Sequence, residues 1–190
     1  MNRMATKSEA VSLHVGFAHP ARNIRLLGIE PGMKIADFGS GVGAYVFAIA
    51  EVLAGSGHVY AIDVQRDLLR RVKNESNRLG YKNVEVLWSD LESSGGSKLK
   101  DGSVDLVLIS NLLFQVNEKK IVIAEAWRII RSGGRLAIID WSDSFSGMGP
   151  PEDDVIKKES AISLAKSNGF ELLKEFPAGA HHYGVIFRKR

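Results

Sequence analysis

The chain has 190 residues, of which 45% are hydrophobic and 25% charged, a balance that indicates a folded domain and excludes a disordered chain. It has a formal net charge of +3 and no cysteine, which excludes disulfides, thiolate metal sites and cysteine nucleophiles. No apolar run is long enough to span a bilayer, so we expect no membrane insertion and a cytoplasmic location. The basic residues are scattered except for Arg188, Lys189 and Arg190, which we expect to form a solvated tail.

Short apolar runs alternate with amphipathic segments along most of the chain. Strands are expected at residues 34–38, 58–63, 84–88, 104–109, 135–140, 170–176 and 183–188. Helices are expected at residues 21–27, 45–53, 66–79, 118–130 and 155–168, with a loop at 141–154. The alternation predicts a parallel sheet with right-handed crossovers, and the short connection between the last two strands predicts an antiparallel hairpin.

Two connections contain glycine pairs. Residues 91–103 have little helical pattern, and the Gly95-Gly96 pair suggests a mobile loop in place of a crossover helix. Ser132, Gly133 and Gly134 are expected to end the helix over 118–130, because glycine commonly follows the last helical turn.

A glycine-rich turn follows the first expected strand. Gly39, Gly41 and Gly43 alternate with Ser40 and Val42, and a helix is expected to begin directly after them. Glycine tolerates positive φ and lets a ligand approach bare backbone, and the N-terminus of the next helix attracts anionic groups. Such turns also serve as plain connections, so the glycines alone do not predict a site.

An acidic residue at the end of the second strand favours a nucleoside site. Asp63 follows Gly43 at about 20 residues, the separation expected of a carboxylate that accepts hydrogen bonds from both ribose hydroxyls. Asp63 is also placed to cap the helix that begins near Arg66, and the two roles are compatible.

Two classes of nucleoside cofactor fit this arrangement: the nicotinamide or flavin dinucleotides, and S-adenosylmethionine. A dinucleotide fingerprint reads Gly-x-Gly-x-x-Gly, whereas here the third glycine comes one residue early and the bulky Tyr45 follows. Further motifs occur in a fixed order: Pro31-Gly32, Asp37 before the glycine turn, Ile62-Asp63, and residues 83–90, 103–107 and 130–136. Together they resemble the class I S-adenosylmethionine-dependent methyltransferases of type 11 or 31, in particular the ubiquinone/menaquinone C-methyltransferase and arsenite methyltransferase branch.

The resemblance implies a three-layer, Rossmann-like α/β fold with a mostly parallel seven-stranded sheet that ends in an antiparallel hairpin. We expect a single methyltransferase domain over residues 1–190. Within it, 1–28 form a leader over the active site, 29–140 form the cofactor-binding core, and 141–190 add a loop, a helix and the hairpin.

The resemblance also implies a set of residues that bind S-adenosylmethionine. These are Asp37, Gly39, Ser40, Gly41, Asp63, Val64, Asp90, Leu91, Ser110 and Asn111. In such enzymes the glycine turn faces the methionine part of the cofactor, Asp37 holds its ammonium group, and Asp63 holds the ribose.

The remaining positions are expected around the adenine and the sulfur. By the same resemblance, Val64 and Leu91 pack on the adenine, Asp90 hydrogen-bonds its amino group, and Ser110 and Asn111 line the sulfur end and the substrate entrance. For Asp90 and Asn111, the alternative is an ordinary role in shaping a turn.

Methyl transfer from a sulfonium requires a general base only where the nucleophile is protonated. The candidate bases are His14, His19 and Asp143, and for each of them a surface or packing role is favoured. His181, His182 and Tyr183 could form a metal or base cluster, but adjacent residues on a strand point to opposite faces, so we favour a hairpin end and expect no metal.

The substrate site is expected from residues 12–22, 111–117 and 141–154. These segments contain Phe17, Leu112, Phe114, Trp141, Phe145 and Met148, which predict a small, partly apolar methyl acceptor. Transfer by in-line displacement leaves S-adenosyl-L-homocysteine as the product. The lack of cysteine excludes the thiol-dependent arsenite mechanism, and no Asn/Asp-Pro-Pro-Tyr motif of the DNA amino-methylating enzymes follows the fourth strand.

Two alternatives stay open at this stage. One is a methyltransferase that acts on RNA or protein, although a single basic tail does not supply a phosphate-binding patch. The other is a non-catalytic subunit that binds S-adenosylmethionine, because binding residues can persist without activity.

Overall fold

The computed structural model describes residues 19–145 and 149–190, so Phe17, His14 and Met148 lie outside the described residues. Its strands are β1 (Lys34–Phe38), β2 (His58–Asp63), β3 (Val84–Trp88), β4 (Val104–Ser110), β5 (Ile130–Trp141), β6 (Phe170–Gly179) and β7 (His182–Lys189). Its helices are α1 (Pro20–Asn23), α2 (Ala44–Leu53), α3 (Arg66–Leu79), α4 (Lys119–Ile129) and α5 (Lys158–Ser167), with 3-10 turns η1 (Ile24–Leu26) and η2 (Glu152–Asp154).

The seven strands form one sheet in the order β3-β2-β1-β4-β5-β7-β6. Strands β1 to β5 are parallel to their neighbours among themselves, whereas β7 is antiparallel to both β5 and β6. The strand order reverses between β1 and β4, which is where open α/β sheets bind their ligands. The predicted fold, with its mostly parallel sheet and C-terminal antiparallel hairpin, is confirmed.

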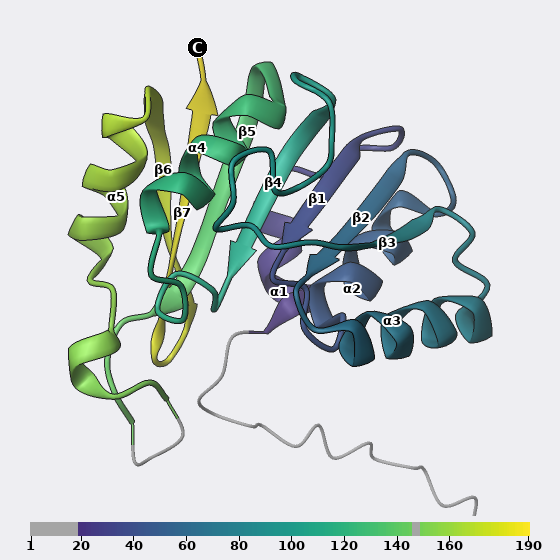
Figure 1. Cartoon of the computed structure of the whole chain (residues 1–190), viewed down its shortest axis with the longest axis horizontal. Coiled ribbons are helices and arrows are strands. Elements are labelled where there is room, and N and C mark those ends of the chain that lie inside the picture. The colour runs from purple at the N-terminus through teal and green to yellow at the C-terminus, as the bar shows by residue number, and fades with distance from the viewer. Residues whose placement is uncertain (1–18, 146–148) are drawn as a thin grey trace, which may run out of the picture.

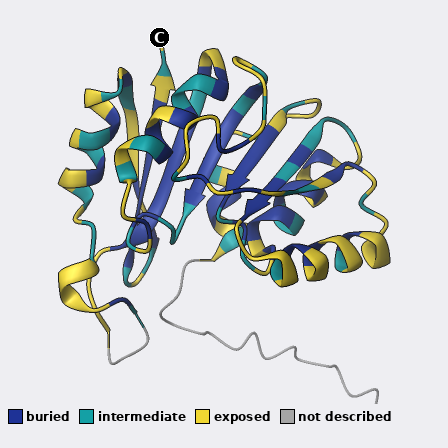
Figure 2. Cartoon of the chain, viewed as in Figure 1, coloured by how far each residue is buried: buried dark blue, intermediate teal, exposed yellow. Residues whose placement is uncertain are grey.

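Helices cover both faces of the sheet (Figure 1). Helices α2 and α3 and the η1 segment bury Ile49, Leu69 and Ile24 against one face, and α4 and α5 bury Ile123 and Ala161 against the other. The central strands are buried along nearly their whole length, whereas α3 is largely exposed (Figure 2). Burial on both faces explains why these strands read as continuous apolar runs in the sequence.

Strand β5 begins earlier than the sequence indicates. Helix α4 ends at Ile129, and Ile130 is already extended and pairs with Val104, so Ser132, Gly133 and Gly134 lie inside the strand. The register shifts between Val104 and Leu106, which marks a β-bulge. A Cβ at Gly134 would come within 2.6 Å of Ile130 Cγ2, so this glycine permits close packing and does not end the helix.

The crossover from β3 to β4 has no helix, as predicted, and its middle is held by hydrogen bonds to α4. The buried carboxylate of Glu125 on α4 accepts hydrogen bonds from Ser97 N at 2.9 Å and from Ser97 Oγ at 2.5 Å. Arg128 donates to the same carboxylate and to Leu99 O at 2.8 Å. These contacts anchor the middle of the crossover to the helix layer.

The C-terminal basic residues do not form a solvated tail. Arg188 and Lys189 lie in β7, and Lys189 Nζ donates hydrogen bonds to Trp127 O at 2.6 Å and Ile130 O at 2.7 Å. Arg190 pairs with Glu171 on β6.

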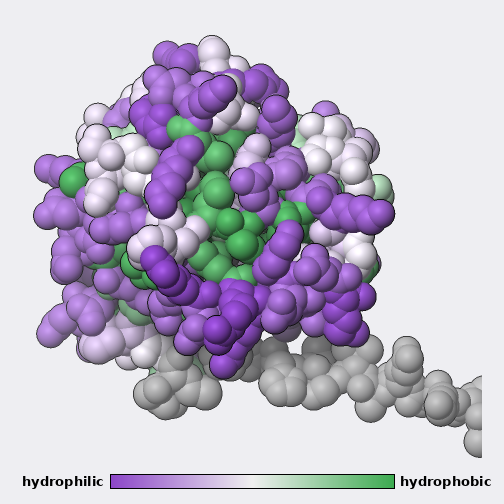
Figure 3. Space-filling model, turned by 45° about the vertical axis from the view of Figure 1, so that its right-hand side comes forward, coloured by the Kyte–Doolittle hydropathy of each residue, from purple (hydrophilic) through white to green (hydrophobic). Residues whose placement is uncertain are grey.

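Elsewhere on the surface, one view shows a hydrophobic area enclosed by hydrophilic residues (Figure 3).

Candidate functional site

Two adjoining cavities lie at the carboxyl ends of the central strands. The first, of about 260 Å³, lies beside the ends of β2 and β3, and the second, of about 280 Å³, lies over the ends of β1 and β4. Gly39, Gly41 and Gln115 line both cavities, so the glycine turn forms the shared wall between them.

Every residue predicted to bind the cofactor lines one or both cavities. The first is lined by Gly39, Gly41, Asp63, Val64, Asp90 and Leu91, and the second by Asp37, Gly39, Ser40, Gly41, Ser110 and Asn111. These residues come from four strands and the loops that follow them, and the parallel sheet brings them together because its carboxyl ends share one edge.

The glycine turn is built for close packing on one side and for an open approach on the other. Gly43 precedes α2 with φ +87°, and a Cβ there would meet Phe47 at 2.9 Å and Val72 at 3.0 Å. Gly41 has φ +53°, but a Cβ there would meet no atom closer than 4.0 Å. Gly41 therefore exposes its backbone to the cavities.

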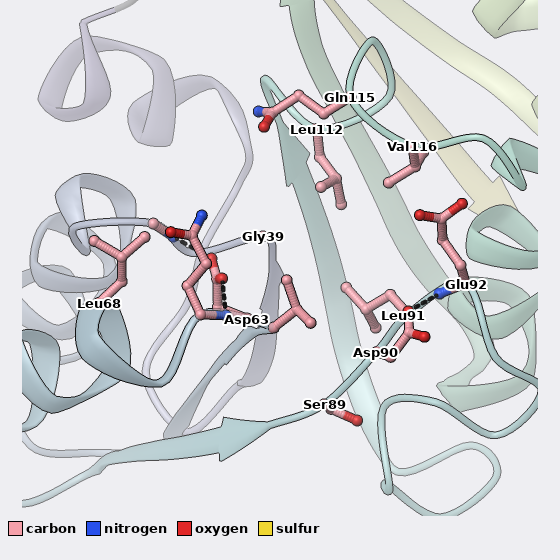
Figure 4. Close-up of a pocket in the computed structure, with 13 residues that line it drawn as sticks. Gly39, Asp63, Leu68, Ser89, Asp90, Leu91, Glu92, Leu112, Gln115 and Val116 are labelled. Atoms are coloured by element: carbon pink, nitrogen blue, oxygen red, sulfur yellow. Dashed lines mark hydrogen bonds between the residues drawn. The ribbon is translucent and has the colours of Figure 1, made fainter.

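Asp63 connects this turn to the start of α3 (Figure 4). Its carboxylate accepts a hydrogen bond from Gly41 N at 2.9 Å and another from Gln65 N at 2.8 Å. The N-cap of α3 is Gln65 and no side chain caps the first turn, so Asp63 contacts the residue before the helix but does not cap it. Each oxygen retains a further lone pair for a ligand hydroxyl.

Asp37 is the second carboxylate at this edge and is 2% exposed. Burial, together with the nearby negative charge of Asp63, raises the pKa of Asp37 to about 8. A cation that enters the second cavity would favour the ionised form of Asp37. The geometry and charge of this carboxyl therefore suit a ligand ammonium group.

The outer wall of the first cavity is held by two acidic residues. The Asp90 carboxylate accepts hydrogen bonds from Glu92 N at 2.9 Å and Ser93 Oγ at 3.2 Å, so its role in shaping the turn is observed. Glu92 Oε2 accepts from Asn117 N at 2.8 Å and Glu118 N at 2.7 Å, next to the start of α4. This pair of contacts ties the cavity wall to the helix layer.

The second cavity is lined by both polar and apolar residues. Asn23 Nδ2 donates to the Tyr45 hydroxyl at 3.0 Å, and Tyr45 also contacts the Ser110 side chain. Asn111 adopts a left-handed conformation with φ +52°, and its carbonyl accepts a hydrogen bond from Gln115 Nε2 at 2.6 Å. The alternative interpretation of Asn111 as a turn residue is thus consistent with its backbone.

Several cavity residues carry buried polar atoms that lack a hydrogen-bond partner among the described residues. They are Ser40 Oγ, Ser89 Oγ, Asn111 Oδ1 and both ring nitrogens of His182. Unpaired buried polar atoms are rare in proteins and call for a partner. The positions of the serine and asparagine atoms around the cavities, together with Asp37 and Asp63, fit a polar nucleoside ligand that bears an ammonium group.

Sequence reasoning missed His182. This residue was interpreted only as a hairpin end, yet it lines the second cavity from the start of β7. Gln65 and Leu68 are further lining residues that no motif indicates, whereas Gln115 lies within the predicted substrate segment 111–117. Their signal in the sequence is only their position one to five residues beyond a predicted site residue.

The described residues of the expected apolar substrate wall do not line the second cavity. Leu112 lines the first cavity, Trp141 packs on His182 with ring centroids 4.2 Å apart, and Phe145 stacks on His181 at 4.1 Å. Phe114 does not line either cavity. Over residues 19–145 and 149–190 the second cavity is lined by polar side chains and also by the apolar Pro20, Val42 and Ala44, so a partly apolar pocket stays a prediction.

Two of the candidate bases, His19 and Asp143, lie among the described residues. His19 is exposed and precedes α1, and Asp143 Oδ1 lies 2.7 Å from His181 Nδ1. The part of the chain that the structure describes contains no group of three His, Asp or Glu side chains arranged to hold a metal ion. None of its helices has the length and apolar character needed to cross a membrane.

The chain is similar in sequence to several curated methyltransferases. The chain is 26% identical to the arsenite methyltransferase of Halobacterium salinarum over 137 residues, which cover 72% of this chain and 34% of the relative. It is 28% identical to the demethylmenaquinone methyltransferase of Lactococcus lactis over 122 residues, which cover 64% and 47% respectively. The chain therefore spans less than half the length of these two curated relatives.

A solved structure extends the likeness to almost the whole fold. The crystal structure of a SAM-dependent methyltransferase from Aquifex aeolicus superposes with a TM-score of 0.81 and 28% identity, covering 90% of this chain and 89% of that one. The family model described as "Methyltransferase domain" matches residues 29–181. With this match over most of its length, and with the sheet order and glycine turn described above, the chain belongs to the methyltransferase domain family.

Proposed function

We propose that this chain is the catalytic domain of an S-adenosylmethionine-dependent methyltransferase that acts on a small-molecule acceptor. The observation that carries the proposal is the pair of cavities that meet at Gly39 and Gly41, with Asp63 on one side and Asp37 on the other. Residues 29–140 would supply the cofactor site, and residues 1–28 and 141–190 would flank it.

Each part of the cofactor has a chemically suitable partner. Asp37 would neutralise its ammonium group, and Asp63 would accept hydrogen bonds from the ribose hydroxyls. Val64 and Leu91 would contact the adenine, with Asp90 near its amino group. When bound, the cofactor supplies an activated methyl group, so the chain's own residues need chiefly to align the acceptor with it.

A small acceptor is supported by the size of the site and by the relatives. The second cavity measures about 280 Å³. Asp37, Ser40 and the glycine turn form part of its wall, and the cofactor would lie against them. Curated relatives are named for arsenite and for demethylmenaquinone. The chain has no cysteine to support thiol-dependent chemistry, so we do not propose arsenite as the acceptor.

Calorimetric titration tests the proposal directly. We expect S-adenosylmethionine and S-adenosylhomocysteine to bind with one site per chain, and NAD to give no binding heat. Binding of NAD in place of S-adenosylmethionine would contradict the proposal. Transfer of labelled methyl groups to the small-molecule fraction of a cell extract, compared with its protein and RNA fractions, then tests the acceptor class.

A specific feature favours RNA as a second candidate acceptor. Trp88 is 48% exposed at the end of β3, its ring lies 3.6 Å from Arg66 Cζ, and Lys98 Nζ lies 5.3 Å from the same ring. Exposed aromatic rings beside cations form stacking platforms for single-stranded nucleic acid. For this candidate, an oligoribonucleotide should quench Trp88 fluorescence and accept the labelled methyl group.

A further inference from the structure

His182 lies on the same face of the sheet as the predicted cofactor residues. Asp37 follows Ile35 by two residues and Ser110 follows Leu108 by two, and both apolar residues pack against the layer of α2 and α3. His182 precedes Ile186 of the same layer by four residues. Because side chains alternate along a strand, all three polar side chains project from this face.

The sheet places His182 beyond Ser110, away from Asp37. Strand β5 lies between β4 and β7, and its Trp141 is the register partner of His182. Neighbouring strands are about 4.8 Å apart, so roughly 10 Å of cavity edge separates β4 from β7. If Asp37 marks the ammonium end of the cofactor, His182 marks the opposite end of the second cavity, where the acceptor would lie.

The imidazole of His182 has unused hydrogen-bonding capacity. The residue is 3% exposed and its ring packs on Trp141, yet neither ring nitrogen has a hydrogen-bond partner among the described residues. A neutral imidazole offers one N–H donor and one lone pair. Leaving both unpaired in a buried position is costly, so a polar ligand that reaches this end of the cavity would be stabilised there.

The charge of the lining selects the kind of ligand. Among the described residues, neither lysine nor arginine lines the second cavity, and the ionisable ones that do are Asp37, Tyr45 and His182. Burial raises the pKa of Tyr45 and lowers that of His182 to about 4, so both are uncharged at neutral pH. With Asp37 reserved for the ammonium group, the acceptor end offers no counter-charge to a carboxylate, phosphate or amine cation.

We propose that His182 binds the hydroxyl group of an uncharged small-molecule acceptor in the second cavity. This inference rests on the proposed function and names the acceptor class for the same site. The hydroxyl would donate its hydrogen to the unprotonated ring nitrogen of His182. The lone pairs of the hydroxyl oxygen would then point away from the ring.

The proposed reaction is the methylation of the hydroxyl oxygen. The hydroxyl oxygen forms a bond to the methyl carbon, the electron pair of the broken carbon–sulfur bond stays on sulfur, and the hydroxyl proton passes to His182 and then to solvent. The proton becomes strongly acidic as the new bond forms, so a weakly basic imidazole is sufficient to accept it.

His181 provides a matched control in the adjacent position. Its Nδ1 lies 2.7 Å from Asp143 Oδ1, its ring stacks on Phe145, and it does not line either cavity. The variant His181→Gln therefore changes a histidine of the same hairpin without changing the proposed acceptor contact.

The test follows the imidazole ¹⁵N signals of His182 while phenol, benzoate or benzylamine is added to protein saturated with S-adenosylhomocysteine. We expect phenol to shift the His182 signals and the two charged probes to leave them unchanged. His182→Phe should bind phenol about five- to tenfold more weakly, the loss expected of one hydrogen bond. His182→Gln should retain part of the affinity, and His181→Gln should retain all of it.

The proposal is wrong if no probe shifts the His182 signals, if His182→Phe binds phenol as tightly as the unmodified protein, or if a charged probe binds better than phenol. S-adenosylhomocysteine affinity, measured by calorimetry, should stay within twofold in all three variants and reports folding. If the chain does not bind S-adenosylhomocysteine at all, the proposed function fails. The phenol titration of the ligand-free protein then still tests His182 by its own signals.

Discussion

Asp63 accepts a hydrogen bond from the backbone amide of Gly41 at 2.9 Å, so the carboxylate at the end of β2 holds the glycine turn that follows β1. Its second oxygen accepts from Gln65 N at 2.8 Å. The residue proposed to bind the ribose therefore also fixes the loop against which the cofactor would lie, and its replacement should affect both stability and binding.

Replacing Asp63 with alanine should weaken S-adenosylmethionine binding at least tenfold. Hydrogen bonds to a charged group contribute about 1.5–3 kcal/mol each, and about 1.4 kcal/mol corresponds to a factor of ten. Calorimetric titration measures the loss. The control is Asp67→Ala, which removes an exposed carboxylate on α3 that pairs only with Arg70 in the described ion pairs. Equal affinity for the two variants would contradict a ribose-binding role.

Asp37 should make cofactor binding depend on pH. Its pKa is raised to about 8, so at pH 6.5 the carboxyl is protonated in the free protein and should release a proton when an ammonium group binds. The cofactor's own α-amino group has an ordinary pKa of about 8, so affinity should be greatest near pH 8 and fall on either side. Calorimetry in buffers of different ionisation enthalpy counts the released proton.

The same carboxyl should make the ligand-free protein less stable as the pH rises towards 8. A carboxyl whose folded-state pKa is raised stabilises the fold fully below its unfolded-state value of 3.8, and this stability is lost as pH rises towards 8. Asp37→Asn should remove this slope in denaturant unfolding experiments. It should also remove the acidic limb of the affinity profile. Unchanged profiles in the variant would show that Asp37 does not titrate in this range.

The fold could be predicted from the sequence because local signals and the sheet agree. The strand limits at Lys34–Phe38, His58–Asp63 and Val84–Trp88 match the structure, since each run is largely apolar and is bounded by turn residues. The start of β5 could not be predicted this way. Gly133 and Gly134 are typical of a helix end, and only pairing of Ile130 with Val104 on another strand shows that they form a bulge.

The candidate site was predictable only where a motif marks a strand end. Asp37, Asp63 and Asp90 follow apolar runs, so their position at one edge follows from a parallel sheet. His182 belongs to the antiparallel hairpin, and its place in the second cavity depends on the pairing of β7 with β5. No local pattern around His182 encodes that long-range register.

Substituting Gly41 should separate binding from stability. Its φ of +53° imposes the usual strain on alanine, about 1–2 kcal/mol, but no atom lies closer than 4.0 Å to the added Cβ. Gly80 is a matched control, because it has φ +76° at the end of α3 and no atom within 4 Å. We expect similar losses of unfolding free energy in Gly41→Ala and Gly80→Ala. Only Gly41→Ala should lose affinity for S-adenosylmethionine, by tenfold or more.

Glu125 should anchor the helix-free crossover. Burial raises its pKa, but hydrogen bonds from Arg128 and Ser97 outweigh this effect and lower the pKa overall. Removing one partner of a buried ion pair typically costs about 3–5 kcal/mol, so Glu125→Ala should lower the free energy of unfolding by roughly 3 kcal/mol, because Arg128 remains partly exposed.

Denaturant unfolding at several pH values measures this contribution. Because the folded-state pKa of Glu125 is lowered, its stabilisation should be complete above the ordinary value of 4.5 and disappear as pH falls below it. Glu75→Ala, which removes a surface carboxylate paired with Arg78 on α3, is the control and should destabilise the fold much less than Glu125→Ala. Equal losses in the two variants at neutral pH would show that the crossover does not depend on Glu125, because Glu125 contacts Ser97 of the crossover, whereas the ion pair of Glu75 lies within its own helix.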